Sequence, residues 1–434
     1  MRLMCLLLTL LFSLCAFGQD ASMFRGNPEH TGIYEAAGVP EFTKIKWKFH
    51  TDGQVISSPA VVNDTAYVGS TDHNLYAIDL ETGTQKWKFE TKGRITSSPA
   101  VAGNKVYFGS YDGAFYALGA ANGQLIWKFE TGGERRFAGK HLHGMQPVRE
   151  TMPDPFDFYL SSPAVWNGAV YFGSGDGNVY ALDLSSGKLM WKFQTGDVVH
   201  ASPAISDGIL FVGSWDSYLY ALDATSGKEK WRFKTGEDHD IYNQVGIQSS
   251  AAVDHGTVYF GCRDSNFYAV DARSGKQKWV FNNKGSWVIG SPAVKDGKVY
   301  FATSDSGLFY ELDANSGLFV FSLDFKHWPM FSSPAIAGNT LYVGSHSGHL
   351  IAINLTSRKV DWTFQTEGSH QNGARYTKPD GSPNYEAVFT EDFYDNLVAG
   401  MVKMMSVGAI LSSPVIVDRV IYVGSTDGYL YALM

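Results

Sequence analysis

The sequence predicts an all-β fold, an eight-bladed β-propeller of four-stranded blades. The main observation is a repeat that opens with a motif close to Ser-Ser-Pro-Ala and recurs at a basal spacing of about 40 residues, with insertions between some copies. The second serine position of the eight copies falls at Ser58, Ser98, Ser162, Ser202, Ser250, Ser291, Ser333 and Ser413. The 46 glycines and the 14% of aromatic residues fit a turn-rich β protein.

Each copy divides into four short strands, as the third copy illustrates. Residues 161–165 carry small side chains and are expected to line the crowded axis. Residues 170–174 and 179–183 are apolar on both faces, because blades pack on both sides, and the Gly-Asp-Gly at 175–177 between them is a tight turn. A Ser-Gly turn at 186–187 leads to the outer strand, residues 189–193.

One aromatic residue recurs in the outer strand of every blade. The set consists of Trp47, Trp87, Trp127, Trp191, Trp231, Trp279, Phe321 and Trp362. In most copies a turn glycine lies four residues earlier, but Arg358 stands there before Trp362. A large ring at a fixed blade position can cover the gap to the next blade, so these residues are expected to dock blades together rather than to form a ligand cage.

The two ends of the repeat region complete each other. Residues 429–434 form a third strand with no outer strand after it, and residues 45–49 form an outer strand with no blade before it. Their pairing would close the eighth blade and leave no open edge in the ring. Residues 44–434 are therefore predicted to form one propeller, and residues 19–43 are expected to pack on its surface.

The docking motif resembles that of a known propeller family. Residues 77–83 read Ala-Ile-Asp-Leu-Glu-Thr-Gly, and with Trp87 they match the tryptophan-docking motif of propellers of the pyrroloquinoline quinone (PQQ) type; the match repeats at 181–191, 221–231 and 269–279. The resemblance covers about residues 44–434. It leaves two branches open: quinoprotein alcohol dehydrogenases, and non-catalytic propellers similar to BamB, the scaffold of outer-membrane protein assembly.

Residues 1–18 have the pattern of a signal peptide. Arg2 gives a positive start, residues 6–14 are apolar, and the Ala-Phe-Gly at 16–18 gives a cleavage site. The mature protein is thus expected to be periplasmic or extracellular. A lipid anchor at Cys15 is the weaker alternative, since the bulky Leu14 precedes that cysteine. No later segment is expected to span a membrane.

Charge and cysteine content narrow the function classes. A formal net charge of −8 at pH 7 makes nucleic acid a poor partner. Cys262 is the single cysteine after the signal segment, which excludes an internal disulfide and a cysteine-based zinc site. Cys262 itself is interpreted as a small buried residue, with a reactive thiol as the alternative.

Insertions between blades mark the candidate binding face. They fall at about residues 131–160, 235–248, 281–289 and 367–410, all in links from an outer strand to the next blade, which emerge at one end of the ring. The last insertion is expected to contain a helix from residue 392 to about 405 that docks onto the propeller. The candidate face residues are Arg135, Arg136, His141, His143, Trp215, His239, Tyr242, Arg263 and Trp287.

The face residues carry alternatives of their own. His141 and His143 could ligate a metal or could be solvated, and no third ligand is evident, so no metal site is assigned. Arg135 and Arg136 could hold a carboxylate or phosphate or could pair with the acidic turns. Trp215 and Arg263 stand before a turn aspartate where other blades have Thr71, Tyr111 or Gly175, and such large or charged side chains could line the mouth of the axial funnel.

The function predicted from these observations is that of an exported, non-enzymatic scaffold or binding protein, similar to BamB. It would bind a protein partner or small ligand at the insert-bearing face, as a monomer and with no certain cofactor. The alternative is an oxidoreductase that uses PQQ with Ca²⁺ on alcohols or sugars. Against it, the dehydrogenases that share this fold carry an adjacent Cys-Cys disulfide, which this chain lacks. A hydrolase or polysaccharide-binding module is a third interpretation, without a readable carboxylate pair.

Overall fold

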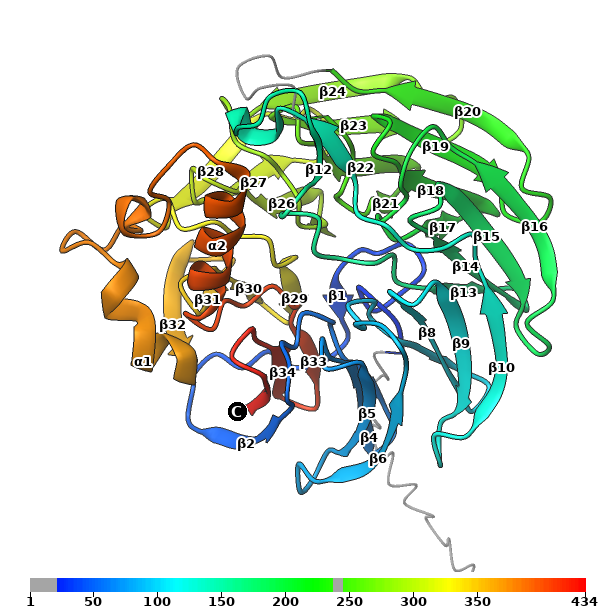
Figure 1. Cartoon of the computed structure of the whole chain (residues 1–434), viewed down its shortest axis with the longest axis horizontal. Helices are drawn as coiled ribbons and strands as arrows, with labels where there is room; N and C mark the ends of the chain where they lie inside the picture. The colour runs from blue at the N-terminus through cyan, green and yellow to red at the C-terminus, as the bar shows by residue number, and fades with distance from the viewer. Residues whose placement is uncertain (1–21, 237–244) are drawn as a thin grey trace, which may run out of the picture.

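Eight four-stranded antiparallel sheets surround a central axis in the computed structural model, which describes residues 22–236 and 245–434 (Figure 1). The predicted eight-bladed propeller is confirmed. From the axis outward, the first four blades are β3 (Ala60–Val62), β4 (Thr65–Gly69), β5 (Asn74–Asp79) and β6 (Gln85–Glu90); β7 (Ala100–Ala102), β8 (Lys105–Ser110), β9 (Ala114–Gly119) and β10 (Leu125–Glu130); β13 (Ala164–Trp166), β14 (Ala169–Gly173), β15 (Asn178–Asp183) and β16 (Leu189–Gln194); β17 (Ala204–Ser206), β18 (Ile209–Gly213), β19 (Tyr218–Asp223) and β20 (Glu229–Lys234).

The last four blades repeat this order. They are β21 (Ala252–Asp254), β22 (Thr257–Gly261), β23 (Asn266–Asp271) and β24 (Gln277–Asn282); β25 (Ala293–Lys295), β26 (Lys298–Ala302), β27 (Leu308–Asp313) and β28 (Phe319–Asp324); β29 (Ala335–Ala337), β30 (Thr340–Gly344), β31 (His349–Asn354) and β32 (Lys359–Gln365); β33 (Val415–Val417), β34 (Val420–Gly424), β35 (Tyr429–Leu433) and β2 (Ile45–His50). The pairing of β2 with β35, with Trp47 opposite Ala432, confirms the predicted closure of the eighth blade.

Several elements lie outside the blades. They are β1 (Ile33–Tyr34), the hairpin of β11 (Ala138–Lys140) and β12 (Thr151–Pro153), the helices α1 (Glu367–Tyr376) and α2 (Tyr394–Met405), and the 3-10 turns Leu142–Gly144 and Tyr385–Ala387. The helix predicted in the last insertion is confirmed as α2. The sequence did not predict α1, because it has no apolar stripe; Thr366 caps its first turn by accepting a hydrogen bond from the Ser369 amide at 3.3 Å.

Close approach of neighbouring blades explains a glycine at the end of most second strands. A Cβ atom on Gly173 would lie 2.4 Å from Cγ1 of Val199, and one on Gly213 would lie 2.3 Å from Cγ2 of Ile247. Both partners belong to the link that enters the next blade. A side chain at the glycine would therefore push two blades apart near the axis, where the ring is narrowest.

The outer-strand tryptophans join each blade to the next. Trp87 Nε1 donates to the carbonyl of Ala120 at 2.9 Å, and Trp191 Nε1 donates to that of Ala224 at 3.0 Å. The ring also covers the turn glycine of the next blade: a Cβ atom on Gly123 would lie 2.6 Å from the Trp87 ring, and its φ of +67° favours glycine in any case. The repeated Trp and Gly are thus two halves of one contact.

The sixth and seventh blades use a different contact at this position. Phe321 replaces the tryptophan, and the smaller ring leaves room for Arg358 at the turn that is glycine elsewhere. The Arg358 guanidinium donates to both carboxylate oxygens of Glu311, at 3.1 and 3.0 Å, and lies 5.9 Å from the Phe321 ring centroid. Glu311 itself stands where other third strands have alanine, so three departures from the repeat form one local network.

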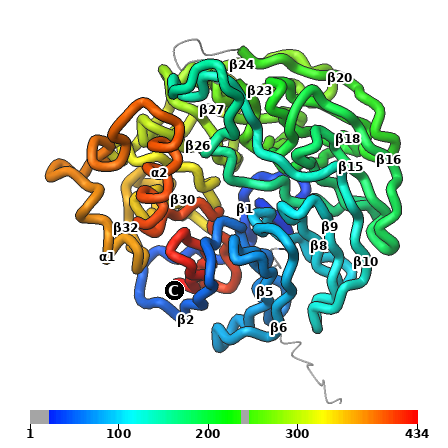
Figure 2. The backbone as a smooth tube through the Cα atoms, viewed as in Figure 1, coloured from blue at the N-terminus to red at the C-terminus, as the bar shows by residue number. Residues whose placement is uncertain are grey.

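The N-terminal segment crosses one end of the axis instead of covering the outside of the ring. Amides of the inner strands lack a strand partner on the side of the axis, and carbonyl groups of the N-terminal segment accept hydrogen bonds from them. The donor and acceptor pairs are Val101 with Ser22, Ile205 with Pro28, Val253 with Glu29, Val294 with Thr31, and Ile336 with Gly32. β1 pairs in parallel with β29. Arg25 and His30 are almost completely buried there. Figure 2 shows this segment in blue near the centre of the ring.

Serine side chains link the inner strands around the axis. The amide of Ser58 donates to Oγ of Ser98 at 3.0 Å, the same contact recurs between most neighbouring blades, and the amide of Ser413 donates to Oγ of Ser58 at 2.9 Å. The serine of the opening motif therefore has a structural role: it satisfies the amide of the neighbouring blade where no strand pairing exists.

Candidate binding face

The insertions gather at one end of the propeller. Residues 131–160 follow β10, residues 235–248 follow β20 and residues 367–410 follow β32, so all three leave an outer strand at the same end. In Figure 1 the hairpin strand β12 and the helices α1 and α2 lie in front of the blades. The face residues predicted in the second insertion, His239 and Tyr242, lie outside the described residues.

An apolar layer closes the axis under this face. We call it the axial seal; it consists of Phe156, Phe158, Tyr159, Phe331 and Leu411, supplied by the first insertion and by the links into two blades. Phe158, Phe331 and Leu411 are buried, and the Tyr159 hydroxyl donates to the carbonyls of Leu411 at 3.0 Å and Phe331 at 3.3 Å. The first insertion therefore fills the mouth of the ring with its own side chains.

A buried ion pair fixes one part of this insertion. Nη1 of Arg263 donates to Oδ2 of Asp154 at 2.7 Å, and both residues are fully buried. The guanidinium carbon lies 4.6 Å from the ring centroid of Trp215 and 3.9 Å from that of Trp287, so the cation is held between two indoles. Burial alone would raise the pKa of Asp154, but Arg263 and then His143, 3.4 Å away, hold that pKa well below its usual range.

A second buried network fixes the insertion at another point. Nδ1 of His200 lies 2.8 Å from Oδ1 of Asp157, and Nε2 lies 3.4 Å from Oε2 of Glu134. Burial alone would lower the pKa of His200, but the two carboxylates outweigh it and raise the pKa to about 9. Glu134 also accepts from the Ser174 hydroxyl at 2.8 Å and from the Gly175 amide at 2.7 Å. His200 is therefore a cation at neutral pH.

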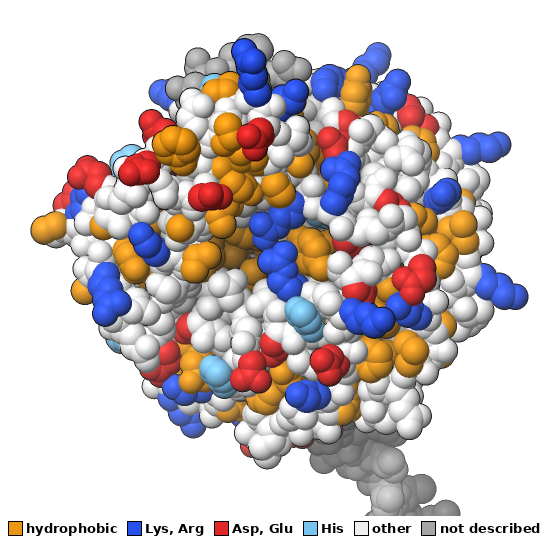
Figure 3. Space-filling view, in the orientation of Figure 1, with side chains coloured by type: hydrophobic (Ala, Val, Ile, Leu, Met, Phe, Trp, Pro, Cys, Tyr) orange, Lys and Arg blue, Asp and Glu red, His pale blue; other side chains and the backbone are white. Residues whose placement is uncertain are grey.

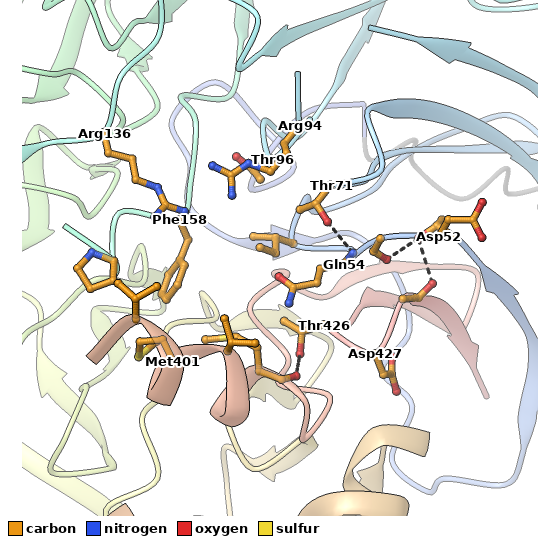
Figure 4. A pocket seen from close by; sticks show the side chains of 18 of the residues that line it. Asp52, Gln54, Thr71, Arg94, Thr96, Arg136, Phe158, Met401, Thr426 and Asp427 are labelled. Carbon is orange, nitrogen blue, oxygen red and sulfur yellow. Dashed lines mark hydrogen bonds between the residues drawn. The ribbon is translucent and has the colours of Figure 1, made fainter. Parts of the chain in front are cut away.

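Beside the axial seal lies an open pocket, which we call the rim pocket. Its volume is about 740 Å³, within the range of small-ligand sites. Six parts of the chain line it: residues 50–56, Thr71, residues 94–96, the insertion at 136–158, α2, and residues 426–428. Figure 3 shows an apolar hollow with Lys and Arg side chains at its edge near the centre of this face, and Figure 4 shows the pocket from close by.

Two arginines border the rim pocket. Arg136 comes from the first insertion and Arg94 from the link between the first two blades, and Figure 4 shows both on the same side of the pocket. The Arg94 guanidinium also lies 4.7 Å from the ring centroid of Tyr111. Burial, and then the charge of Arg136, lower the pKa of Arg94. In the described part of the chain, neither guanidinium forms an ion pair with a carboxylate.

The predicted face residues that the structure describes do not form one site. Trp215, Arg263, Trp287 and His143 come together in the buried ion-pair cluster, at the mouth of the funnel but under the insertion. Arg136 borders the rim pocket. Arg135 points elsewhere and pairs with Asp197 at 2.8 Å on the surface. His141 adopts a left-handed backbone conformation, with φ of 53°, just before a 3-10 turn.

Several site residues were not predicted. His200 had a usable signal, because it precedes the opening motif where other copies have Ile56, Leu160, Ile289 or Leu411. Arg94 had no such signal, because the link that carries it contains no insertion and its role depends on segments far away in the sequence. Cys262 is fully buried, and burial raises its pKa well above the usual range, which agrees with the structural interpretation of this thiol.

The axis does not fit the cofactor of the alternative function. The cavity between the axial seal and Phe24 is lined by the eight serines and has a volume of about 30 Å³, room for about one water molecule and not for a tricyclic quinone. Across the described ranges, no group of three or more His, Cys, Asp and Glu side chains is arranged so that it could hold a metal ion. Two buried acids of the first insertion, Asp154 and Asp157, are already paired with Arg263 and His200.

The fold and its docking motif define a propeller with repeats of the PQQ type. The family model of the outer membrane protein assembly factor BamB matches residues 40–141, 159–283 and 263–391, which together make up most of the chain. The chain therefore belongs to this family. No curated protein sequence matches it significantly.

Solved structures share the fold at low sequence identity. BamB from Moraxella catarrhalis has a TM-score of 0.63 at 15% identity, over 90% of this chain and 97% of that one. A europium-containing methanol dehydrogenase has a TM-score of 0.67 at 16% identity, over 96% and 98% of the two chains. The quinohemoprotein alcohol dehydrogenase from Comamonas testosteroni has a TM-score of 0.69 at 15% identity, over 96% and 80%. These similarities establish the fold and leave the function to the site.

Within residues 22–236 and 245–434, no helix has the length and apolar character needed to cross a bilayer. The predicted signal peptide, residues 1–18, lies outside the described residues.

Proposed function

We propose that this protein is an exported, non-enzymatic binding propeller, similar to BamB, that engages a partner through its insert-bearing face in the periplasm or outside the cell. Membership of the BamB family supports the scaffold role, and the leader-like pattern of residues 1–18 supports export. The chain is expected to act as a monomer and to bind no nucleic acid.

The observation that carries this proposal is the closed axis. The first insertion fills the funnel with Phe156, Phe158 and Tyr159, and the buried pairs Arg263–Asp154 and His200–Asp157 hold it there. A fixed insertion presents a preformed surface, which lowers the entropy cost of binding a partner. The same closure removes the axial space in which a cofactor would be enclosed.

The surface of α2 is the part of this face best suited to a protein partner. Phe393 and Val402 are 54% and 66% exposed although they are large and apolar. Immobilised mature protein should capture a partner from an envelope extract, and Phe393→Asp should reduce that capture at least tenfold. Leu318→Asp is the matched control, because Leu318 is 69% exposed at a turn of the sixth blade, away from the insertions. Equal losses in both variants would place the interface elsewhere.

A PQQ-dependent oxidoreductase is the second candidate, because one of the similar structures is a europium-containing methanol dehydrogenase and another is a quinohemoprotein alcohol dehydrogenase. The rim pocket, with a volume of about 740 Å³, has enough room for such a cofactor. Titration of the mature protein with PQQ and Ca²⁺, followed by tryptophan fluorescence and calorimetry, tests it. We expect no saturable binding. One-to-one binding together with alcohol-dependent reduction of a dye would reverse the assignment.

A further inference from the structure

The rim pocket is built as a small-molecule site rather than as a flat protein interface. Segments that are distant in the sequence form its sides: the link with Arg94, the insertion with Arg136 and Phe158, and the helix with Met401 (Figure 4). A flat or convex protein surface could not reach the bottom of a pocket with side walls. A ligand of limited size, bound by the walls together, fits this shape.

The cationic side of the pocket is unusual because its charge is not offset. By contrast, Arg135 pairs with Asp197, and Arg263 pairs with Asp154. Arg94 and Arg136 are close enough for each charge to affect the other, and Nε of Arg136 is buried without a hydrogen-bond partner among the described residues. Two partly buried like charges destabilise each other, and an anion between them would offset that repulsion.

The opposite wall is apolar and adaptable. Val398, Met401, Val402 and Met405 of α2 line the pocket, and Phe158 lies between them and the arginines. Methionine side chains are flexible and tolerate different apolar shapes. A ligand that reaches from the arginines to α2 therefore needs an apolar body beside its charged group.

Acidic groups at the far side limit the charge of the ligand. Asp52 and Asp427 also line the pocket. The Asp427 carboxylate accepts hydrogen bonds from the Tyr431 hydroxyl at 2.7 Å and the Gly368 amide at 3.1 Å, which hold it at that end of the pocket. A ligand with several negative groups would place one of them near these acids, whereas a ligand with one anionic end would not.

We propose that the rim pocket binds a monocarboxylate with an apolar body, with its carboxylate between Arg94 and Arg136 and its body against α2. The planar guanidinium group suits a carboxylate because it can donate two parallel hydrogen bonds. This small-ligand site is additional to the partner-binding role proposed above and does not depend on it.

Calorimetric titration with hexanoate, octanoate and decanoate, below their micelle concentrations, tests the proposal. One-to-one binding should tighten about fourfold for each added CH₂ group that is buried. Decanol, which has the same body without the charge, should bind at least tenfold more weakly than decanoate. Equal affinity for the alcohol would overturn the role of the arginines, and no saturable binding of any of the three acids would overturn the site.

Variants identify the side chains. Arg94→Gln and Arg136→Gln should each weaken decanoate binding at least tenfold, while Arg135→Gln, the matched control one residue away, should leave it unchanged. Val402 is exposed and lines the pocket, so Val402→Asp should weaken binding by repulsion and Val402→Lys should preserve it. Circular dichroism confirms that each variant is folded. A loss with Arg135→Gln as large as with Arg136→Gln would refute the assignment.

An alkyl phosphate provides the last arm of the test. Octyl phosphate carries more negative charge than octanoate at pH 7, and the acids at the far side of the pocket should disfavour it. Tighter binding of octyl phosphate than of octanoate would show that the site takes phosphates, and would overturn the carboxylate assignment. Inorganic phosphate alone should not bind measurably, because it lacks the apolar body.

Discussion

Removal of the Arg263 side chain should loosen the first insertion and destabilise the protein. In Arg263→Met the carboxylate of Asp154 would stay fully buried without its main counter-ion, and its remaining partners would be the Phe156 amide at 2.8 Å and His143 at 3.4 Å. Loss of one partner of a buried ion pair costs about 3–5 kcal/mol, because the remaining charge is neither solvated nor paired. Methionine keeps apolar contact with Trp215 and Trp287, so most of this cost is electrostatic.

The cost of Arg263→Met has an upper limit that the assay must take into account. If the insertion around Asp154 can detach while the blades stay folded, the loss cannot exceed the free energy that holds the insertion in place. Equilibrium unfolding in urea therefore measures the global cost, and hydrogen exchange of residues 131–160 measures the local cost. Faster exchange in this segment is expected in either case.

A double-mutant cycle separates charge from packing. Asp154→Asn together with Arg263→Met leaves no unpaired charge, so the double variant should be more stable than Arg263→Met alone. A loss below about 1 kcal/mol in Arg263→Met, with unchanged exchange in residues 131–160, would refute the claim that this ion pair holds the insertion. The same claim would be refuted if the loss of stability in the double variant equalled the sum of the losses in the two single variants.

Two further predictions concern other contacts. The pKa of His200 is about 9 in the folded protein and 6.5 for the free side chain. The pairing of His200 with Asp157 therefore contributes its full stabilisation below pH 6.5. Up to about 3 kcal/mol of this stabilisation is lost as the pH rises through 9. Urea unfolding at several pH values should show this fall, and His200→Gln should flatten it. Phe321→Trp should cost about 1–3 kcal/mol by collision with Arg358. Adding Arg358→Gly and Glu311→Ala should restore thermal stability, and a neutral single variant would contradict this contact.

The fold was predictable because the repeat gives the same information eight times. One copy read alone would leave its strands ambiguous, but the constant spacing from the opening serine to the outer-strand aromatic fixes them together. The same comparison showed Phe321 and Arg358 as exceptions. It did not connect them with Glu311, since the contact joins different blades and depends on how the outer strands approach each other.

The site was predictable only where it departs from the repeat. Trp215 and Arg263 stand out against the other copies, and the structure brings them together around the same insertion. Asp154 lies within an insertion that has no counterpart in other blades, so no register exists from which its partner could be inferred. Arg94 belongs to an ordinary link and becomes part of a pocket only through Arg136 and α2, which follow much later in the chain.

The positions at which residues depart from the repeat indicate which surface of the propeller is accessible for binding. Identical blades give an open funnel at the axis, and this chain closes it from both ends, with the N-terminal segment on one side and the first insertion on the other. His200 and Arg263, which break the pattern of their blades, both contact that insertion. Closure of the axis moves the accessible concave surface outward to the rim, between the insertion and α2. Binding should therefore change with substitutions at the rim and remain nearly unaffected by conservative changes to the serines that line the axis.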